Sequence, residues 1–282
     1  MILYRKLLLL SSILITYCSY SQLEGKCVDE FGQAIPYVNI SLKGKAFGTV
    51  TNADGKFYFE KDFITEKDII IISHLSFEQK TIPLPLKDTQ IVLLAKVQRL
   101  EEVVVSSIKR KFKEKTVGTK TDTENIVNYF NSNNLGTEIG KIIKVRKNKT
   151  YTLKNVQFNI PSFEHKSATF RINFYNITDE TISLIKINET DNIVKITKSG
   201  MVKVDISDQY LSFENDFLVA VEWIGFENNS TDENELNNIK FSSTVFSGPY
   251  ISRSNVNETW GNRKLVMNIG IGLFLEVNEY SK

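Results

Sequence analysis

The residues best suited to ligand chemistry in this 282-residue chain are aromatic and basic side chains near its C-terminal end. Tyr250, Arg253 and Trp260 lie among Gly, Pro, Ser and Asn residues, which are typical of loops. Flat aromatic faces bind the apolar side of pyranose rings, and arginine donates hydrogen bonds to hydroxyl groups. These residue types also dominate binding energy at protein interfaces. We therefore predict that a ligand site lies here. The alternative is that Trp260 seals one end of a sandwich and Arg253 hydrogen-bonds a loop.

Groups that catalyse reactions or hold metal ions are sparse. The sequence contains two histidines, two cysteines and no G-x-S-x-G, P-loop or paired-histidine motif. His74 and Glu78 are four residues apart, which on one strand separates them by about 13 Å. The acidic residues that could supply oxygen ligands to Ca²⁺ lack a dense ligand loop: Asp205, Asp208, Asp216 and Glu222. We therefore expect no catalytic residue, no metal site, no cofactor and no enzymatic activity.

The N-terminal segment has the order of a secretory signal peptide. Two basic residues precede an apolar run at residues 7–15, and the small residues at 19 and 21 predict cleavage before Gln22. The apolar run is too short for a membrane-spanning helix, which needs about 20 residues. Cys18 would suggest lipidation, but the tyrosine before it replaces the small residue that a lipoprotein signal needs. We expect residues 1–21 to be removed and the mature chain, without a transmembrane segment, to reach the periplasm or the outer-membrane or cell surface.

Charge is balanced in this sequence. The chain has 35 basic and 33 acidic residues, and loss of the two basic residues in the leader would leave 33 of each. A neutral mature chain argues against nucleic acid and anionic membrane as partners. We expect the partner to be an envelope protein or a glycan. Only Cys27 would remain after cleavage, so an internal disulfide is excluded.

Residues 25–59 predict two successive β-hairpins. Val38, Ile40 and Leu42 alternate with polar residues, as in a strand with one buried face. Asn52-Ala53-Asp54-Gly55 favours a tight turn with Gly55 at positive φ, because glycine adopts such angles at little cost. The phenylalanines at 57 and 59 then fall at core positions of the next strand.

This stretch resembles a known domain. The string from Gly25 to Ile40, GKCVDEFGQAIPYVNI, followed by GTVTNADGKF at 48–57, resembles the carboxypeptidase-regulatory-like domain of Bacteroidota envelope proteins. The resemblance implies a seven-stranded sandwich of transthyretin or immunoglobulin-like type over residues 22–97. It does not imply peptidase activity, since this domain is an accessory to enzymes and transporters. The string LEEVVV at 100–105 is similar to the segment that precedes the plug of TonB-dependent transporters, but the remaining chain is too short for a barrel of about 22 strands.

The remaining chain predicts a linker and a second β domain. Residues 98–138 are predicted as a linker with one helix, because Thr121 and Glu124 have capping-box spacing and an apolar stripe follows at 126–130. Residues 139–282 contain many alternating strands joined by polar turns, which favours a jelly-roll-like antiparallel sandwich. On one such strand Phe170, Ile172 and Phe174 face the core, and Arg171 and Asn173 point outward. Three strings here, FRINFY at 170–175, VDIS at 204–207 and VEWI at 221–224, are similar to an uncharacterised C-terminal module of other Bacteroidota surface proteins.

The sequence thus predicts a mainly β protein without catalytic machinery. We expect a non-enzymatic exported binding or scaffolding protein of the bacterial cell envelope. One alternative is a carbohydrate-binding protein that uses aromatic residues of the C-terminal sandwich. A hydrolase is a further alternative, which would need acidic groups converging in a cleft.

Overall fold

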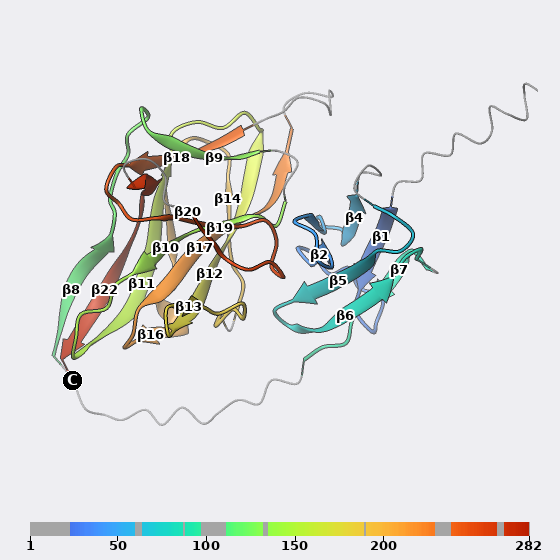
Figure 1. Ribbon diagram of the computed structural model, residues 1–282, viewed down its shortest axis with the longest axis horizontal. Helices are drawn as coiled ribbons and strands as arrows, with labels where there is room; N and C mark the ends of the chain where they lie inside the picture. The colour runs from blue at the N-terminus through green and yellow to red at the C-terminus, as the bar shows by residue number, and fades with distance from the viewer. Residues whose placement is uncertain are drawn as a thin grey trace, which may run out of the picture.

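The computed structural model describes residues 23–59, 64–86, 88–96, 111–131, 135–188, 190–228, 238–263 and 268–281. Within these ranges the chain forms two β domains that lie side by side (Figure 1). The predicted signal peptide, with Cys18, and the LEEVVV segment lie outside them. In the described part of the chain, no helix has the length and apolar character needed to cross a membrane.

The first domain is a two-layered sandwich. Its strands are β1 (Leu23–Val28), β2 (Asn39–Leu42), β3 (Gly48–Val50), β4 (Lys56–Phe59), β5 (Ile69–His74), β6 (Phe77–Pro83) and β7 (Gln90–Val92). They form a sheet of order β4-β1-β7 and a sheet of order β3-β2-β5-β6. The predicted seven-stranded sandwich is therefore confirmed. Its core contains the alternating apolar residues of the hairpins, Ile40, Leu42, Phe57 and Phe59, together with the buried Cys27.

The turn between β3 and β4 has the predicted geometry. Gly55 has φ 73° and donates its N–H to the carbonyl of Asn52 at 3.0 Å. The side-chain oxygen of Asn52 accepts hydrogen bonds from the N–H groups of Asp54 and Lys56. A Cβ atom at position 55 would lie 2.6 Å from the carbonyl oxygen of Cys27. Position 55 therefore requires glycine for both backbone angle and space.

We expect Gly55→Val to lower the free energy of unfolding by about 2 kcal/mol. Two costs add, the strain of a valine at positive φ and the clash of its Cβ with the carbonyl oxygen of Cys27. Gly44→Val is the matched control, since Gly44 has φ 72° but nothing within 4 Å of its added Cβ. It should cost about 1 kcal/mol from strain alone. Urea denaturation of both variants measures the difference. A Gly55 variant as stable as the parent would contradict the turn assignment.

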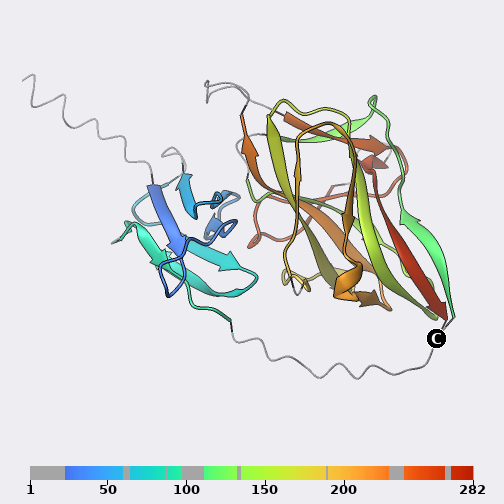
Figure 2. The ribbon, with the colours of Figure 1, turned by 180° about the vertical axis from the view of Figure 1, so that it is seen from behind.

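The second domain is a larger antiparallel sandwich of jelly-roll-like type. Its strands are β8 (Phe112–Gly118), β9 (Val127–Asn131), β10 (Glu138–Ile143), β11 (Lys149–Ile160), β12 (Ser167–Thr178), β13 (Thr181–Ile182), β14 (Asn192–Ile196), β15 (Gly200–Asp205), β16 (Ser212–Phe213), β17 (Phe217–Glu227), β18 (Asn238–Thr244), β19 (Tyr250–Arg253), β20 (Gly261–Arg263), β21 (Gly270–Ile271) and β22 (Leu273–Ser281). One sheet has the order β13-β12-β17-β10-β19-β20 with β14 beside β12, and another has the order β15-β11-β22-β8 with β16 beside β11. A third sheet, β21-β18-β9, completes the domain (Figure 2).

Aromatic side chains fill the core between these sheets. Trp223 is fully buried and stacks on Phe130, with ring centroids 5.9 Å apart. Phe158 and Phe170 pack edge to face beside it. The inward residues of β12 are the ones that the alternation predicts.

The predicted linker helix is wrong, and so is the predicted boundary at 139. Among the described residues of 98–138 no helix occurs, and the short 3₁₀ helix η2 (Ser207–Gln209) lies elsewhere. Residues 112–118 form β8 against β22, and residues 127–131 form β9 against β18. Phe130 is buried while Tyr129 is exposed, as expected for a strand. Pairing with β18, more than 100 residues downstream, outweighs the local helix signal.

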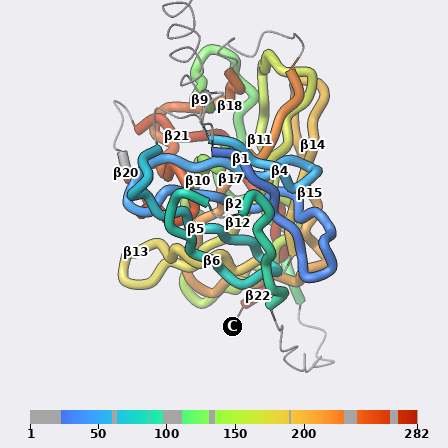
Figure 3. Tube along the Cα trace, turned by 90° about the vertical axis from the view of Figure 1, so that its right-hand side faces the viewer, coloured from blue at the N-terminus to red at the C-terminus, as the bar shows by residue number. Residues whose placement is uncertain are grey.

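A polar seam joins the two domains. Arg171 donates a hydrogen bond to the carbonyl of Tyr37 at 2.7 Å, and Asn257 donates one to Ser41 Oγ at 2.5 Å. His74 Nε2 lies 3.5 Å from an Asp191 carboxylate oxygen. Seen from the side of the first domain, β2 and β5 lie in front of the sheet that contains β10, β17 and β12 (Figure 3). The outward face of that sheet is therefore an interface between domains.

Candidate functional site between the two domains

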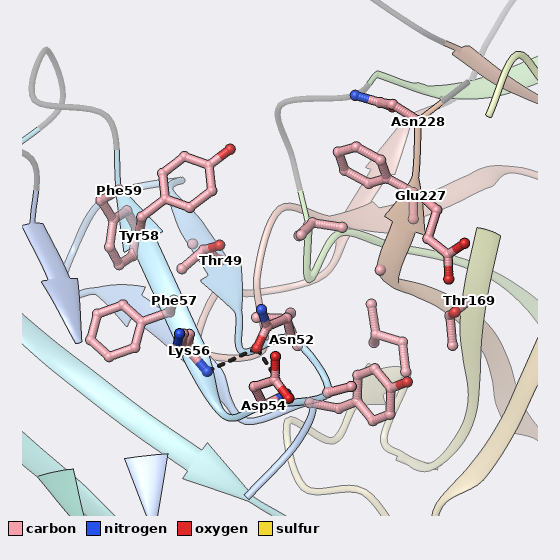
Figure 4. A pocket seen from close by; sticks show the side chains of 18 of the residues that line it. Thr49, Asn52, Asp54, Lys56, Phe57, Tyr58, Phe59, Thr169, Glu227 and Asn228 are labelled. Carbon is pink, nitrogen blue, oxygen red and sulfur yellow. Dashed lines mark hydrogen bonds between the residues drawn. The ribbon is translucent and has the colours of Figure 1, made fainter. Parts of the chain in front are cut away.

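A groove with a volume of about 900 Å³ lies between the domains. The first domain supplies the β3–β4 hairpin to one wall, and the second domain supplies β12, β14 and β17 to the other (Figure 4). Ligand sites often lie at domain interfaces and have volumes of about 300–1,000 Å³. The groove is therefore the candidate site of this protein.

The first-domain wall combines polar groups with an aromatic ring. Because β4 alternates, Phe57 is buried in the core while Lys56 and Tyr58 face out of the sandwich. The Tyr58 side chain is 62% exposed. Asn52 and Asp54 lie at the hairpin turn next to Lys56, and Tyr58 lies further along β4 (Figure 4). The turn described above holds this set of side chains in place.

The second-domain wall is built at the end of β17. Phe226 packs on the His165 ring with centroids 4.6 Å apart, and His165 Nδ1 lies 3.0 Å from Asn228 Oδ1. Glu227 pairs with Lys195 at 2.5 Å. The hydrogen bond from Lys195 lowers the pKa of Glu227. This wall therefore offers an aromatic ring, amide groups and a carboxylate held in its charged form.

The residues predicted from the sequence as a ligand site lie elsewhere, on and beyond β19. Arg253 is only 3% exposed, and its guanidinium carbon lies 4.3 Å from the centroid of the Trp260 ring. Trp260 donates its indole N–H to the carbonyl of Ser183 at 3.2 Å. Tyr250 is partly buried against the main core. The structure brings Arg253 and Trp260 together, but turns the guanidinium into the protein. Their role in ligand binding stays a prediction, and these contacts match the alternative structural role.

Arg253 belongs to a cluster that we call the buried charge network: Glu138, Arg171, Asn173, Tyr175, Lys186, Glu222 and Arg253. Glu138 and Glu222 are fully buried and directly opposite each other on β10 and β17. The amide nitrogen of Asn173 donates to both, at 2.5 Å and 2.6 Å.

Three cations compensate for this pair of carboxylates. Arg253 Nε donates to Glu138 at 2.7 Å, Lys186 Nζ donates to Glu222 at 2.8 Å, and Arg171 lies 3.4 Å from Glu222. Burial raises the pKa of Glu222, but the charges of Lys186 and Arg171 outweigh it and hold that pKa well below its usual range. Neither carboxylate lines the groove. Both carboxylates are therefore buried away from the groove and paired with cations within the protein.

The acidic residues considered for Ca²⁺ are not brought together as a set. Asp205 accepts a hydrogen bond from the Ser207 hydroxyl, and Asp216 forms an ion pair with Lys144. Glu222 lies in the buried charge network. In the described ranges of the chain, no group of three or more His, Cys, Asp or Glu side chains could hold a metal ion. Cys27 is buried, and burial raises the pKa of its thiol to about 12.

Comparison with known proteins identifies the first domain. Residues 23–105 match the family described as the CarboxypepD_reg-like domain. We refer to the first domain as the CarboxypepD_reg-like domain, after the family that it resembles. A TonB-dependent receptor, P39, of Formosa agariphila is 31% identical over 86 residues, which cover 30% of this chain and 8% of the receptor. The chain therefore spans only a small part of that relative, and these similarities fit an envelope-associated β protein.

Solved structures resemble the chain only weakly. The cysteine protease and lectin-like domains of Cwp84, a surface layer associated protein of Clostridium difficile, match 52% of this chain and 32% of their own at 9% identity, with a TM-score of 0.36. The infectious bursal disease virus Gt strain matches 92% of this chain and 63% of its own at 8% identity, with a TM-score of 0.24. Neither likeness carries an argument about function.

The groove residues of the CarboxypepD_reg-like domain are not among the site residues predicted from the sequence. Alternation along β4 predicts that its phenylalanines lie in the core, which is confirmed. The same alternation requires Tyr58 to point outward, and this is the signal in the sequence that could have indicated it. The alternation along β4 does not indicate that the second domain lies opposite these residues.

Proposed function

We propose that this chain is a non-enzymatic, exported binding protein of the bacterial cell envelope that holds an uncharged glycan chain in the groove between its domains. The observation that carries the proposal is the lining of the groove. Tyr58 of the first domain and Phe226 of the second domain contribute aromatic rings to the lining, and Asn52, Asp54 and Asn228 contribute hydrogen-bonding groups. Sugar rings need both, because one face of a pyranose is apolar and its edges carry hydroxyl groups.

The charge of the groove favours a neutral ligand. Its acidic residues are Glu24, Asp54 and Glu227, and its basic residues are Lys56 and Lys195. Lys195 is already paired with Glu227. With neither sign in large excess, the groove offers no strong attraction to a polyanion or polycation. We therefore favour an uncharged oligosaccharide over a charged polymer.

Two observations support a binding role without turnover. The pKa of Glu227 is lowered, whereas a catalytic acid of a glycosidase needs a raised pKa. The buried pair Glu138 and Glu222 lies outside the groove lining. An envelope location is supported by the CarboxypepD_reg-like domain and by the similarity to a TonB-dependent receptor. Export rests on the leader sequence at residues 1–21.

The aromatic wall gives a direct test. We expect Tyr58→Ala to weaken binding of a neutral oligosaccharide roughly tenfold, which corresponds to about 1.4 kcal/mol of lost stacking. The matched control is Tyr129→Ala, because Tyr129 is 56% exposed and lies on β9 outside the groove. Calorimetric titration with cello-, xylo-, manno- and laminari-oligosaccharides measures the affinities.

Three outcomes would contradict the proposal. If the two tyrosine variants lose affinity equally, the groove is not the site. New reducing ends in the titrated mixtures would mean that the protein is a hydrolase. If no oligosaccharide binds while an envelope protein is retained through Tyr58 on a column of the mature chain, the partner is a protein.

A further inference from the structure

A second, smaller cavity lies along the same seam and shares no lining residue with the groove. It has a volume of about 400 Å³ and we call it the seam cavity. Its walls come from β5 and the following turn of the CarboxypepD_reg-like domain and from residues 184–191 and 256–257 of the second domain. The buried charge network lies directly beneath it, because Arg171 and Lys186 belong to both.

Positive charge exceeds negative charge in the seam cavity. Lys96, Arg171 and Lys186 line it, and Asp191 is the one acidic residue among its described lining residues. Arg171 Nε lies 3.0 Å from a carboxylate oxygen of Asp191, and Lys186 forms an ion pair with Glu222. The cavity and the buried charge network beneath it together contain four cations and three carboxylates. The cations are Lys96, Arg171, Lys186 and Arg253, and the carboxylates are Glu138, Asp191 and Glu222. An anionic ligand would balance this excess.

Lys96 is the cation with capacity for a ligand. Its Nζ donates hydrogen bonds to the carbonyl oxygens of His74 at 3.1 Å and Leu75 at 2.9 Å. Within the described parts of the chain it forms no ion pair with a carboxylate. An ammonium group has three donors, so one remains after the two carbonyl contacts. The two carbonyls fix the position of this charge at the edge of the cavity.

A buried hydroxyl stands in the same wall. Ser73 Oγ is buried and has no hydrogen-bond partner among the described residues. Burying a hydroxyl without a partner costs about 1–3 kcal/mol, so such groups in native proteins are usually satisfied by a ligand or solvent. Ser73 precedes His74 on β5 and lines the seam cavity. An oxyanion that reached this wall of the cavity would give the Ser73 O–H the acceptor that it lacks.

The remaining lining suits a small organic molecule. Leu184 and Ile185 are exposed apolar residues at the rim, and Asn39 and Asn257 add amide groups. A volume of about 400 Å³ lies at the lower end of small-molecule sites, which span about 300–1,000 Å³. A monosaccharide-sized molecule would fit inside it.

We propose that the seam cavity binds a small organic oxyanion, such as an acidic sugar, whose carboxylate or phosphate group is held by Lys96 and Ser73. This site is separate from the groove and does not depend on a glycan binding there. A ligand in this position contacts both domains, so its binding would also strengthen their association.

The experiment uses the full mature chain and matched pairs of probes. Glucuronate and glucose 6-phosphate are titrated against ¹⁵N-labelled protein, and glucose is the neutral control for both. We expect shifts of the amide signals of residues 73–75 and 96 with both acids and not with glucose. Stronger binding of one acid distinguishes a carboxylate ligand from a phosphate ligand.

Variants assign the binding to the cavity. Lys96→Gln should weaken binding of the preferred acid at least tenfold, and Ser73→Ala should weaken it several-fold. Lys80→Gln is the matched control, because Lys80 also donates to a backbone carbonyl, that of Val92, and lies outside the cavity. Equal losses in Lys80→Gln and Lys96→Gln would overturn the proposal, since the effect would be long-range charge alone. Equal binding of glucose, or no binding of either acid at 10-fold molar excess over a 1 mM sample, would overturn it as well.

Discussion

Arg253→Met is expected to lower the free energy of unfolding by about 3–5 kcal/mol, because it leaves one member of a buried charge pair without its partner. Arg253 Nε and the carboxylate of Glu138 are 2.7 Å apart, and Glu138 is fully buried. The guanidinium also donates to the hydroxyl of Tyr175 at 2.6 Å. Methionine preserves much of the packing against Trp260 but supplies no charge. Urea denaturation followed by tryptophan fluorescence measures the loss.

The double variant Arg253→Met/Glu138→Met separates charge from packing. Replacing both partners removes the uncompensated carboxylate, so we expect it to recover much of the stability that the single variant loses. Lys154→Met is the control, because Lys154 and Glu114 form an exposed pair at 2.7 Å and such pairs contribute about 0–1 kcal/mol. If the Arg253 variant loses no more stability than this control, the network does not stabilise the fold as argued.

Acidification from pH 7 to pH 4.5 is expected to cost about 2 kcal/mol of stability through His74 alone. Burial lowers the pKa of His74 to about 4, against the attraction of Asp191, and Arg171, Lys186 and Lys96 lower it further. The unfolded histidine has a pKa of about 6.5. Between these values the unfolded chain binds a proton that the folded chain does not, so stability falls as pH falls. The contribution is fully present above about pH 6.5 and is lost as pH decreases towards about 4.

His74→Asn isolates this contribution in urea denaturation at the two pH values. The variant should lose about 2 kcal/mol less than the parent on acidification. His165→Asn is the matched control, because burial also lowers the pKa of His165 but its ring lies away from the seam cavity, against Trp223 and Phe226. It should retain the part of the pH dependence that belongs to His74. Identical pH dependence in the parent and the His74 variant would show that the seam does not exclude the imidazolium.

Local patterns in the sequence determined much of the fold. Alternation along the strands placed Ile40, Phe57 and Phe170 in the cores of their domains. The turn at Gly55 was predictable because only glycine adopts its backbone angle without strain. The resemblance of residues 25–57 to a known domain is confirmed by the match over residues 23–105. These features depend on neighbours close in the sequence, which is why the sequence alone could determine them.

Tertiary structure decided what depends on distant parts of the chain. Residues 127–131 form a strand because β18 pairs with them, although the local pattern resembles a helix. Arg171 and Asn173 point out of the core as predicted, yet they are buried because the other domain and residues 183–192 cover them. Arg253 faces Glu138, 115 residues before it, and so becomes an internal ion pair. The groove is lined by residues of both domains, Tyr58 from one and Phe226 from the other, and the alternation within either domain does not predict that they line the same groove.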